Sequence, residues 1–156
     1  MNALVVYYSR TGTTKKVAER ISTLLGCDIE EIHDTTNRSG PVGWMRAGRD
    51  LGSKKLTTLE IVKKDPAEFD TAVIGTPIWN HTISTPIRTY ISHYKEHFKN
   101  VAFFCTGDST DDNPFSEMEL LSGRKPVATL RLHRKKEVEA NQYQHKVEEF
   151  VRKIAT

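Results

Sequence analysis

Patterns of buried strands and of amphipathic helices alternate along this chain of 156 residues. Short continuous apolar runs predict strands that are covered on both faces, and apolar positions at helical spacing predict the helices that cover them. Alternation of this kind builds a parallel sheet with right-handed crossovers. The sequence therefore predicts an α/β fold, a doubly wound three-layer sandwich around a five-stranded parallel sheet, as a single domain over residues 1–156. The expected strands are residues 3–8, 28–33, 71–75, 101–105 and 127–132.

The connection between the second and third strands has the weakest pattern. Residues 34–58 contain four glycines and one proline, and glycine lowers helix stability. A helix in this segment would place four apolar side chains on one face, those of Trp44, Met45, Ala47 and Leu51. Residues 58–64 precede Pro66 and are expected to be extended. After the third strand the signal is clear again, because Thr85 and Pro86 suit the cap and the first turn of a helix.

The stretch Ser9–Thr14 joins the first strand to the first helix and indicates an anion site. The first N–H groups of a helix have no partner within it, and the helix dipole places partial positive charge there. Gly12 allows the backbone to approach a ligand closely, and four hydroxyls add neutral donors. The stretch lacks the glycine patterns of Walker and dinucleotide-binding loops. It predicts a phosphate site, and the alternative is that Thr13 or Thr14 only caps the helix.

Two further loops are expected beside this one. In parallel α/β sheets, ligands lie outside the carboxyl ends of the strands, near the change in strand order. With the strand order 2-1-3-4-5, the loops Thr76–Ile83 and Thr106–Asp112 lie next to the first loop. A ligand with a phosphate at one end and a flat ring at the other fits this arrangement. Trp79 offers a face for stacking, and Gly107 permits close approach.

Several side chains of these loops admit a second interpretation. Trp79 is equally suited to anchoring its loop in the core. His81 is expected at the surface or at a ring edge rather than as a catalyst, because no carboxylate within its motif orients it. Asp108, Asp111 and Asp112 are spaced like a magnesium cluster, but acids this close in a loop are common turn formers. No metal site is predicted from them.

These motifs resemble those of the short-chain flavodoxins. The Ser-x-Thr-Gly-x-Thr pattern of residues 9–14 is similar to the phosphate loop of that family and is the specific motif. Thr76–Trp79 and Thr106–Asp108 fall where the family has its two flavin-flanking loops. The resemblance implies a flavodoxin-like fold and FMN bound without a covalent link. The cofactor-binding residues that it implies are Ser9, Arg10, Thr11, Gly12, Thr13, Thr14, Thr76, Pro77, Ile78, Trp79, Asn80, His81, Thr106, Gly107 and Asp108.

The same resemblance implies an electron carrier that shuttles electrons between redox partners. The alternative is an NAD(P)H-dependent FMN or quinone reductase of the same fold, and a binding module without redox function is a third possibility. Phospho-receiver domains share the strand order, but they need clustered acids after the first strand and an aspartate after the third. Ser9–Thr11 and Thr76–Ile78 stand in those places, which argues against a receiver domain.

Two departures from the family pattern affect the expected redox properties. Flavodoxins are typically acidic, whereas this chain has a net charge of +3 and a pI near 8.8. Positive surroundings favour the anionic reduced flavin, so we expect a less reducing potential and redox partners that dock through an acidic surface. Asn80–His81 replace a glycine that many flavodoxins carry beside the flavin, which predicts weaker stabilisation of the one-electron-reduced state.

Composition narrows the remaining classes of partner and compartment. The basic clusters at residues 34–64 and 131–136 are expected to be solvated faces or docking faces, because they lack the interleaved aromatics of nucleic-acid binders. No apolar stretch is long enough to span a bilayer, and the chain starts directly with a strand, so a cytoplasmic monomer without a secretory signal is expected. Cys27 and Cys105 are expected to be reduced thiols in or near the core.

Overall fold

The computed structural model describes residues 1–35, 56–109 and 112–156. The strands are β1 (Ala3–Tyr7), β2 (Asp28–Glu31), β3 (Thr71–Trp79), β4 (Thr82–Ile83), β5 (Asn100–Gly107) and β6 (Thr129–His133). The α-helices are α1 (Thr13–Leu25), α3 (Thr85–Tyr94), α4 (Pro114–Ser122) and α5 (Gln144–Ala155). Short 3-10 helices occur at Pro66–Glu68 (η1) and Lys95–His97 (η2), and a π-helix occurs at Arg134–Glu139 (η3). The helix considered within residues 34–58 falls on 36–55, which lie outside the described residues.

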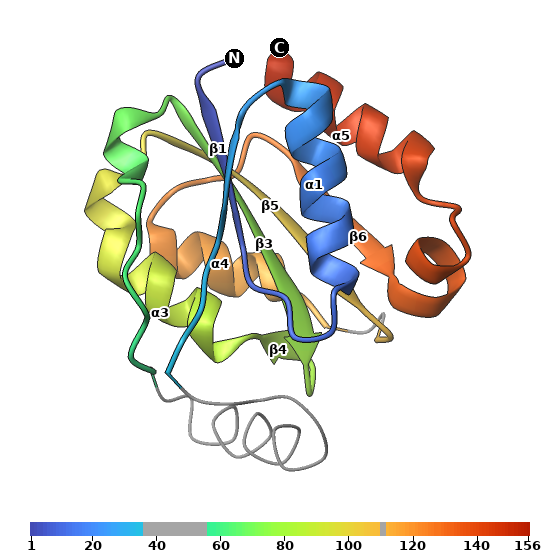
Figure 1. The fold of residues 1–156 in the computed structure, drawn as a ribbon, viewed down its shortest axis with the longest axis horizontal. Coiled ribbons are helices and arrows are strands. Elements are labelled where there is room, and N and C mark those ends of the chain that lie inside the picture. Colours follow the sequence, from blue (N-terminus) through green and yellow to red (C-terminus); the bar gives the residue numbers. More distant parts are fainter. Residues whose placement is uncertain (36–55, 110–111) are drawn as a thin grey trace.

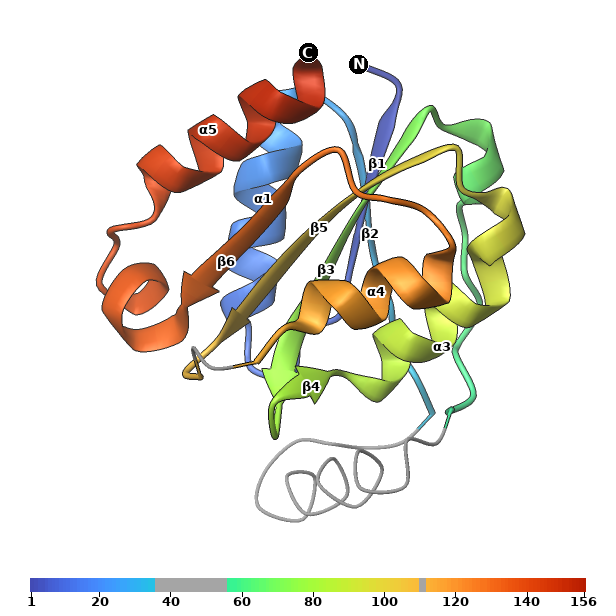
Figure 2. The ribbon, with the colours of Figure 1, turned by 180° about the vertical axis from the view of Figure 1, so that it is seen from behind.

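Five parallel strands form the sheet in the order β2-β1-β3-β5-β6, and β4 pairs antiparallel with the end of β3. Figure 1 shows α1 and α5 on one face of this sheet, and Figure 2 shows α3 and α4 on the other. The predicted doubly wound sandwich is confirmed, including the order of the five parallel strands. The carboxyl ends of β1, β3 and β5 therefore meet at one edge, while both chain termini lie at the opposite end (Figure 1).

Alternate residues of each central strand contribute to two hydrophobic cores. In β1, Leu4 and Val6 belong to the core under α3 and α4, whereas Val5 and Tyr7 belong to the core under α1 and α5. All of β1 is buried, which explains why its sequence is apolar without alternation. Helices packed on both faces hold the strands in place, so the loops at the carboxyl edge start from a rigid support.

Two local expectations were wrong. β3 continues to Trp79 and returns through Asn80–His81 into β4, so the segment expected as a loop at 76–83 is largely a β-hairpin. Proline has no N–H for a strand ladder, so a continuation of β3 through Pro77 was not expected. Ser84, not Thr85, is the N-cap of α3. Residues 58–64 contain no helix, and Leu59 forms an isolated bridge with Asp34, which agrees with the extended segment expected there.

Within the described residues, no helix is long and apolar enough to cross a membrane. Cys27 is a partly exposed free thiol and Cys105 is a buried one. Burial raises the pKa of the Cys105 thiol to about 12 and also raises that of Cys27. Cys105 is therefore a small core side chain rather than a nucleophile.

Candidate functional site

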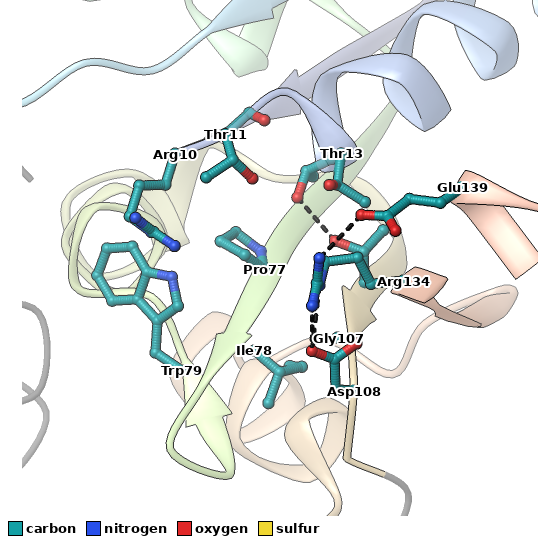
Figure 3. A pocket seen from close by; sticks show the side chains of 13 residues that line it. Arg10, Thr11, Thr13, Pro77, Ile78, Trp79, Gly107, Asp108, Arg134 and Glu139 are labelled. Carbon is teal, nitrogen blue, oxygen red and sulfur yellow. Dashed lines mark hydrogen bonds and ion pairs between the residues drawn. The ribbon is translucent and has the colours of Figure 1, made fainter. Parts of the chain in front are cut away.

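A cavity of about 490 Å³ opens at the carboxyl ends of β1, β3 and β5. It lies at the topological switch point, where doubly wound folds bind their ligands. Figure 3 shows side chains from the start of α1, from the end of β3, from the end of β5 and from η3 around it. The lining residues are Ser9, Arg10, Thr11, Thr13, Thr14, Pro77, Ile78, Trp79, Thr106, Gly107, Asp108, Arg134 and Glu139. The three predicted loops thus meet in one cavity, but Gly12, Thr76, Asn80 and His81 are not part of its lining.

The first wall is the turn from β1 into α1. Gly12 is the N-cap of α1 at a φ of 100°, a left-handed conformation that suits glycine, and neither Thr13 nor Thr14 caps the helix through its side chain. Instead, the Ser9 Oγ accepts hydrogen bonds from the Gly12 N–H at 3.0 Å and from the Lys15 N–H at 3.2 Å. The capping alternative is therefore wrong for both threonines. Thr13 lines the cavity, and Thr14 is buried beside it.

The second wall is the β3–β4 hairpin. Its two-residue turn has Asn80 at a φ of 48° and His81 at a φ of 68°, a pair of positive values that matches a type I′ turn. Both residues thus occupy the left-handed region without a glycine, and weaker stabilisation of the one-electron-reduced state stays a prediction. Thr76 is fully buried and hydrogen-bonds to Ser84, so it fixes the root of the hairpin instead of facing the cavity.

Trp79 combines the two interpretations given to it. Its side chain is almost completely buried, and its indole meets the Tyr8 ring edge to face at a centroid distance of 5.5 Å. It also lines the cavity, where the Arg10 side chain lies beside the indole (Figure 3). Trp79 is thus an anchored wall residue, and flavin stacking on its ring stays a prediction.

A buried ion pair secures the hairpin from behind. Arg88 in α3 is nearly inaccessible and donates from Nε and Nη2 to the Glu117 carboxylate of α4, at 3.1 and 3.0 Å. Arg88 Nη2 also donates to the Thr82 Oγ1 at 3.1 Å, and that hydroxyl donates to Glu117 at 2.6 Å. This closed network ties β4 to two helices, so it supports the strained turn.

The third wall follows β5. A Cβ atom on Gly107 would lie 2.9 Å from the Cβ of Ile78, so this glycine allows the second and third walls to approach each other. Thr106 is buried, and its Oγ1 lies 2.9 Å from the Oγ1 of Thr14 in a hydrogen bond that links this wall to the first. The three walls are therefore connected through buried contacts before any ligand enters.

Two wall residues were not predicted, Arg134 and Glu139 of η3. Arg134 donates from Nη2 and Nε to the Asp108 Oδ2, at 2.7 and 3.1 Å, and from Nη1 to the Glu139 Oε1 at 2.8 Å. The basic stretch 131–136 had suggested a solvated or docking face, yet Arg134 faces the cavity in Figure 3. The topology could have indicated that η3 lies near the cavity, because η3 follows the carboxyl end of β6 and β6 lies next to β5.

His81 points to the third loop and has a carboxylate nearby after all. Its Nδ1 lies 3.0 Å from the Ser109 Oγ and 3.5 Å from an oxygen of Asp112, a nearly buried acid that also pairs with Arg131. The expectation that no carboxylate within its own motif orients His81 is confirmed, but it missed Asp112, which comes from the third loop. Among residues 1–35, 56–109 and 112–156, no three His, Cys, Asp or Glu side chains are grouped to hold a metal ion, and Asp111 lies outside these ranges.

Comparison with known proteins agrees with this architecture. The fold and the cavity define a doubly wound α/β protein with a ligand site at its switch point. The family model described as flavodoxin matches residues 2–154, so the chain belongs to the flavodoxin family. No curated protein sequence matches it significantly.

Solved structures show the same fold at low sequence identity. A Lactobacillus acidophilus flavoprotein in complex with FMN is 24% identical, with a TM-score of 0.73, and the match covers 89% of this chain and 97% of that one. A candidate flavoprotein from Bacteroides eggerthii is 20% identical, with a TM-score of 0.76 and coverage of 99% and 98%. Another from Bacteroides uniformis is 25% identical, with a TM-score of 0.74 and coverage of 93% and 97%.

Proposed function

We propose that this protein binds FMN non-covalently in the cavity and carries electrons between redox partners. The observation that carries the proposal is the convergence of the hydroxyl-rich start of α1, the Pro77–Trp79 strand end and the Thr106–Asp108 strand end in one cavity. Membership of the flavodoxin family supports it, and so does the FMN complex of the L. acidophilus flavoprotein. A volume of about 490 Å³ lies within the usual range of small-molecule sites.

The residues present fit the phosphate end of FMN. Thr11 and Thr13 line the cavity at the N-terminus of α1, where backbone N–H groups and the helix dipole favour an anion. Ser9 holds the turn in shape through its two hydrogen bonds from backbone N–H groups. Arg10 adds a cation to the same side of the cavity, and a guanidinium suits a phosphate group.

The other end of the cavity fits a flat apolar ring. Ile78 and Trp79 form one side, and Thr106 and Gly107 form another. FMN, when bound, supplies the redox chemistry. The chain contributes binding and orientation, and its apolar wall excludes water from the ring.

Flavin titration of the purified protein tests the binding half of the proposal. We expect quenching of FMN fluorescence with one site per chain, and weaker binding of riboflavin, which lacks the phosphate. Gly12→Ala should weaken FMN binding because a side chain is strained at a φ of 100°. Gly26→Ala is the matched control, since Gly26 is also left-handed, at a φ of 60°, but ends α1 away from the cavity. Equal affinity for FMN and riboflavin would contradict the phosphate assignment.

The carrier half of the proposal is tested with the FMN-loaded protein. We expect reversible reduction by dithionite and little oxidation of NADH or NADPH in the presence of a quinone. Rapid NAD(P)H-dependent quinone reduction would instead establish the reductase alternative. Absence of bound or bindable flavin would remove both.

We further propose that the redox partners present an acidic surface. Lys15, Lys135 and Lys136 are exposed, and no ion pair is seen for them among the described residues, whereas Asp108 and Glu139 nearby are both paired with Arg134. Positive charge at the cavity side accelerates encounter with an anionic partner and is screened by salt. Ferricyanide should therefore oxidise the reduced protein more slowly as the salt concentration rises, and the opposite trend would contradict this charge assignment.

A further inference from the structure

Arg134 connects the two acidic residues of the cavity wall. Its Nη2 lies 2.7 Å from the Asp108 Oδ2 at the end of β5, and its Nη1 lies 2.8 Å from the Glu139 Oε1 at the end of η3. All three residues line the cavity. Asp108 comes from a distant part of the sequence, and the π-helical turn brings positions 134 and 139 together. Turns of this kind are rare and occur frequently at functional sites.

Arg134 offsets part of the negative charge of the cavity wall. Among the described residues, its charged side chains are Arg10, Arg134, Asp108 and Glu139, two of each sign. Without Arg134, two unpaired carboxylates would face any anionic ligand, and Arg10 would be the remaining cation in the described part of the lining. Like charges repel over several ångströms in a partly screened site, so this imbalance would oppose both phosphate binding and the gain of an electron by the ligand.

The donors of Arg134 are directed at these acids. Nε and Nη2 go to Asp108, and Nη1 goes to Glu139, so each nitrogen of the guanidinium has an acidic partner. The hydrogen bond to Asp108 is the main reason why the pKa of Arg134 is raised, which keeps the residue charged. The guanidinium therefore compensates the acids, and three of its five N–H donors are directed at them.

The backbone around Arg134 is fixed without help from the cavity. The His133 N–H donates to the Glu137 Oε1 at 2.9 Å, and the Lys136 N–H donates to the His133 Nδ1 at 3.2 Å. Glu137 in turn pairs with Lys146 near the start of α5 at 2.6 Å. These contacts hold the π-helical turn from its outer side, so Arg134 starts from a preset position.

We propose that Arg134 is a charge-compensating residue of the cofactor site, which pairs with Asp108 and Glu139 so that the cavity accepts an anionic cofactor and its reduced form. The proposal rests on FMN binding as the proposed function. Arg134 acts through the two acids, and it is a positioning residue rather than a catalytic one.

A set of four variants tests this assignment by FMN and riboflavin affinity and by midpoint potential. Arg134→Gln should raise the dissociation constant for FMN about tenfold, as expected for a nearby unit charge in a partly screened site. The effect on riboflavin, which carries no phosphate, should be smaller, and the midpoint potential should become more negative. Removal of the acids while Arg134 stays, in D108N/E139Q, should act in the opposite direction on both quantities.

The triple variant R134Q/D108N/E139Q distinguishes compensation from direct contact. With no acids left to compensate, its FMN affinity and its potential should return close to the wild-type values. Lys99→Gln is the matched control, because it removes one exposed cation from its pair with Asp70, and neither residue lines the cavity. It should leave FMN affinity and potential unchanged.

The outcomes separate this inference from the proposed function. If the wild type binds no FMN, the proposed function and the role of Arg134 are both overturned. If the wild type binds FMN but R134Q matches it in affinity and potential, only the role of Arg134 is overturned. A triple variant as weak as R134Q also overturns it, because Arg134 would then contact the ligand itself. Should R134Q fail to fold, D108N/E139Q still decides: unchanged affinity and potential there contradict compensation.

Discussion

Arg88 and Arg134 both stabilise walls of the same cavity, but at different depths in the protein. Arg88 lies behind the hairpin, 4% exposed, in a closed network with Glu117 and Thr82. The side chain of Arg134 lies in the cavity wall, 34% exposed, with Asp108 and Glu139 about half exposed. Breaking a buried pair leaves an uncompensated charge in the core, whereas an exposed pair contributes little to folding. The buried arginine therefore maintains the shape of the site, and the exposed one sets its charge.

The largest expected effect breaks the buried network. Arg88→Met should lower the free energy of unfolding by roughly 3 kcal/mol or more, because Glu117 would keep a charge without its partner. Urea denaturation of the apo-protein measures this change. Lys99→Met is the control, because its pair with Asp70 is exposed and spans 3.9 Å, and it should change stability by less than about 0.5 kcal/mol. Equal losses in the two variants would mean that burial does not distinguish these pairs.

A neutral pair at the same edge sharpens the comparison. Thr14→Val should cost about 1–2 kcal/mol of unfolding free energy, since it leaves the buried Thr106 hydroxyl without its hydrogen bond. The double variant T14V/T106V should lose less than the sum of the two single changes, because no polar group is then left unpaired. Denaturation of the three variants measures the coupling, and strict additivity would show that the hydroxyls do not depend on each other.

A smaller effect on stability is expected for the exposed arginine. Arg134→Gln should change the unfolding free energy by less than about 1 kcal/mol, because its ion pairs are partly solvated. The same variant is expected to change cofactor affinity, so it should separate function from folding. A stability loss as large as that of Arg88→Met would make Arg134 a structural residue and remove the contrast between the two arginines.

The smallest expected effect concerns the two thiols, one buried and one partly exposed, which extend the comparison between buried and exposed groups. With its pKa raised to about 12 by burial, Cys105 stays protonated at pH 8 and should resist iodoacetamide in the folded protein. Cys27, which is partly exposed, should be alkylated slowly. Mass spectrometry before and after unfolding assigns the sites. Rapid labelling of Cys105 in the folded state would show that this part of the core opens readily.

The sequence predicted the fold well because strand order and ligand edge follow from general rules. Continuous apolar runs identified β1, β3 and β5, and the alternation with helices implied a parallel sheet with its loops at one edge. Ser9–Thr14, Pro77–Trp79 and Thr106–Asp108 were therefore expected together, and eleven of the thirteen described residues that line the cavity come from them.

The rest of the site depends on tertiary contacts that no local pattern records. Pro77 predicts a strand end, yet pairing with β5 continues β3 to Pro77 and pairing with β4 continues it to Trp79. From the sequence, Arg134 is one of several basic residues expected at the surface. Its position in the cavity wall follows from the π-helical turn, which places it beside Asp108. Asn80 and His81 occupy the left-handed region because the two-residue hairpin turn, anchored at Thr82, requires it.

The position of the chain termini has a practical consequence. Both ends leave the domain on the side opposite the carboxyl ends of the strands, and so opposite the cavity (Figure 1). An affinity tag, a fused reductase domain or a thiol anchor to an electrode can be attached at either terminus and still leave the mouth of the cavity facing solution. Immobilised protein would then present the same face to every arriving molecule, which makes it suited to direct voltammetry.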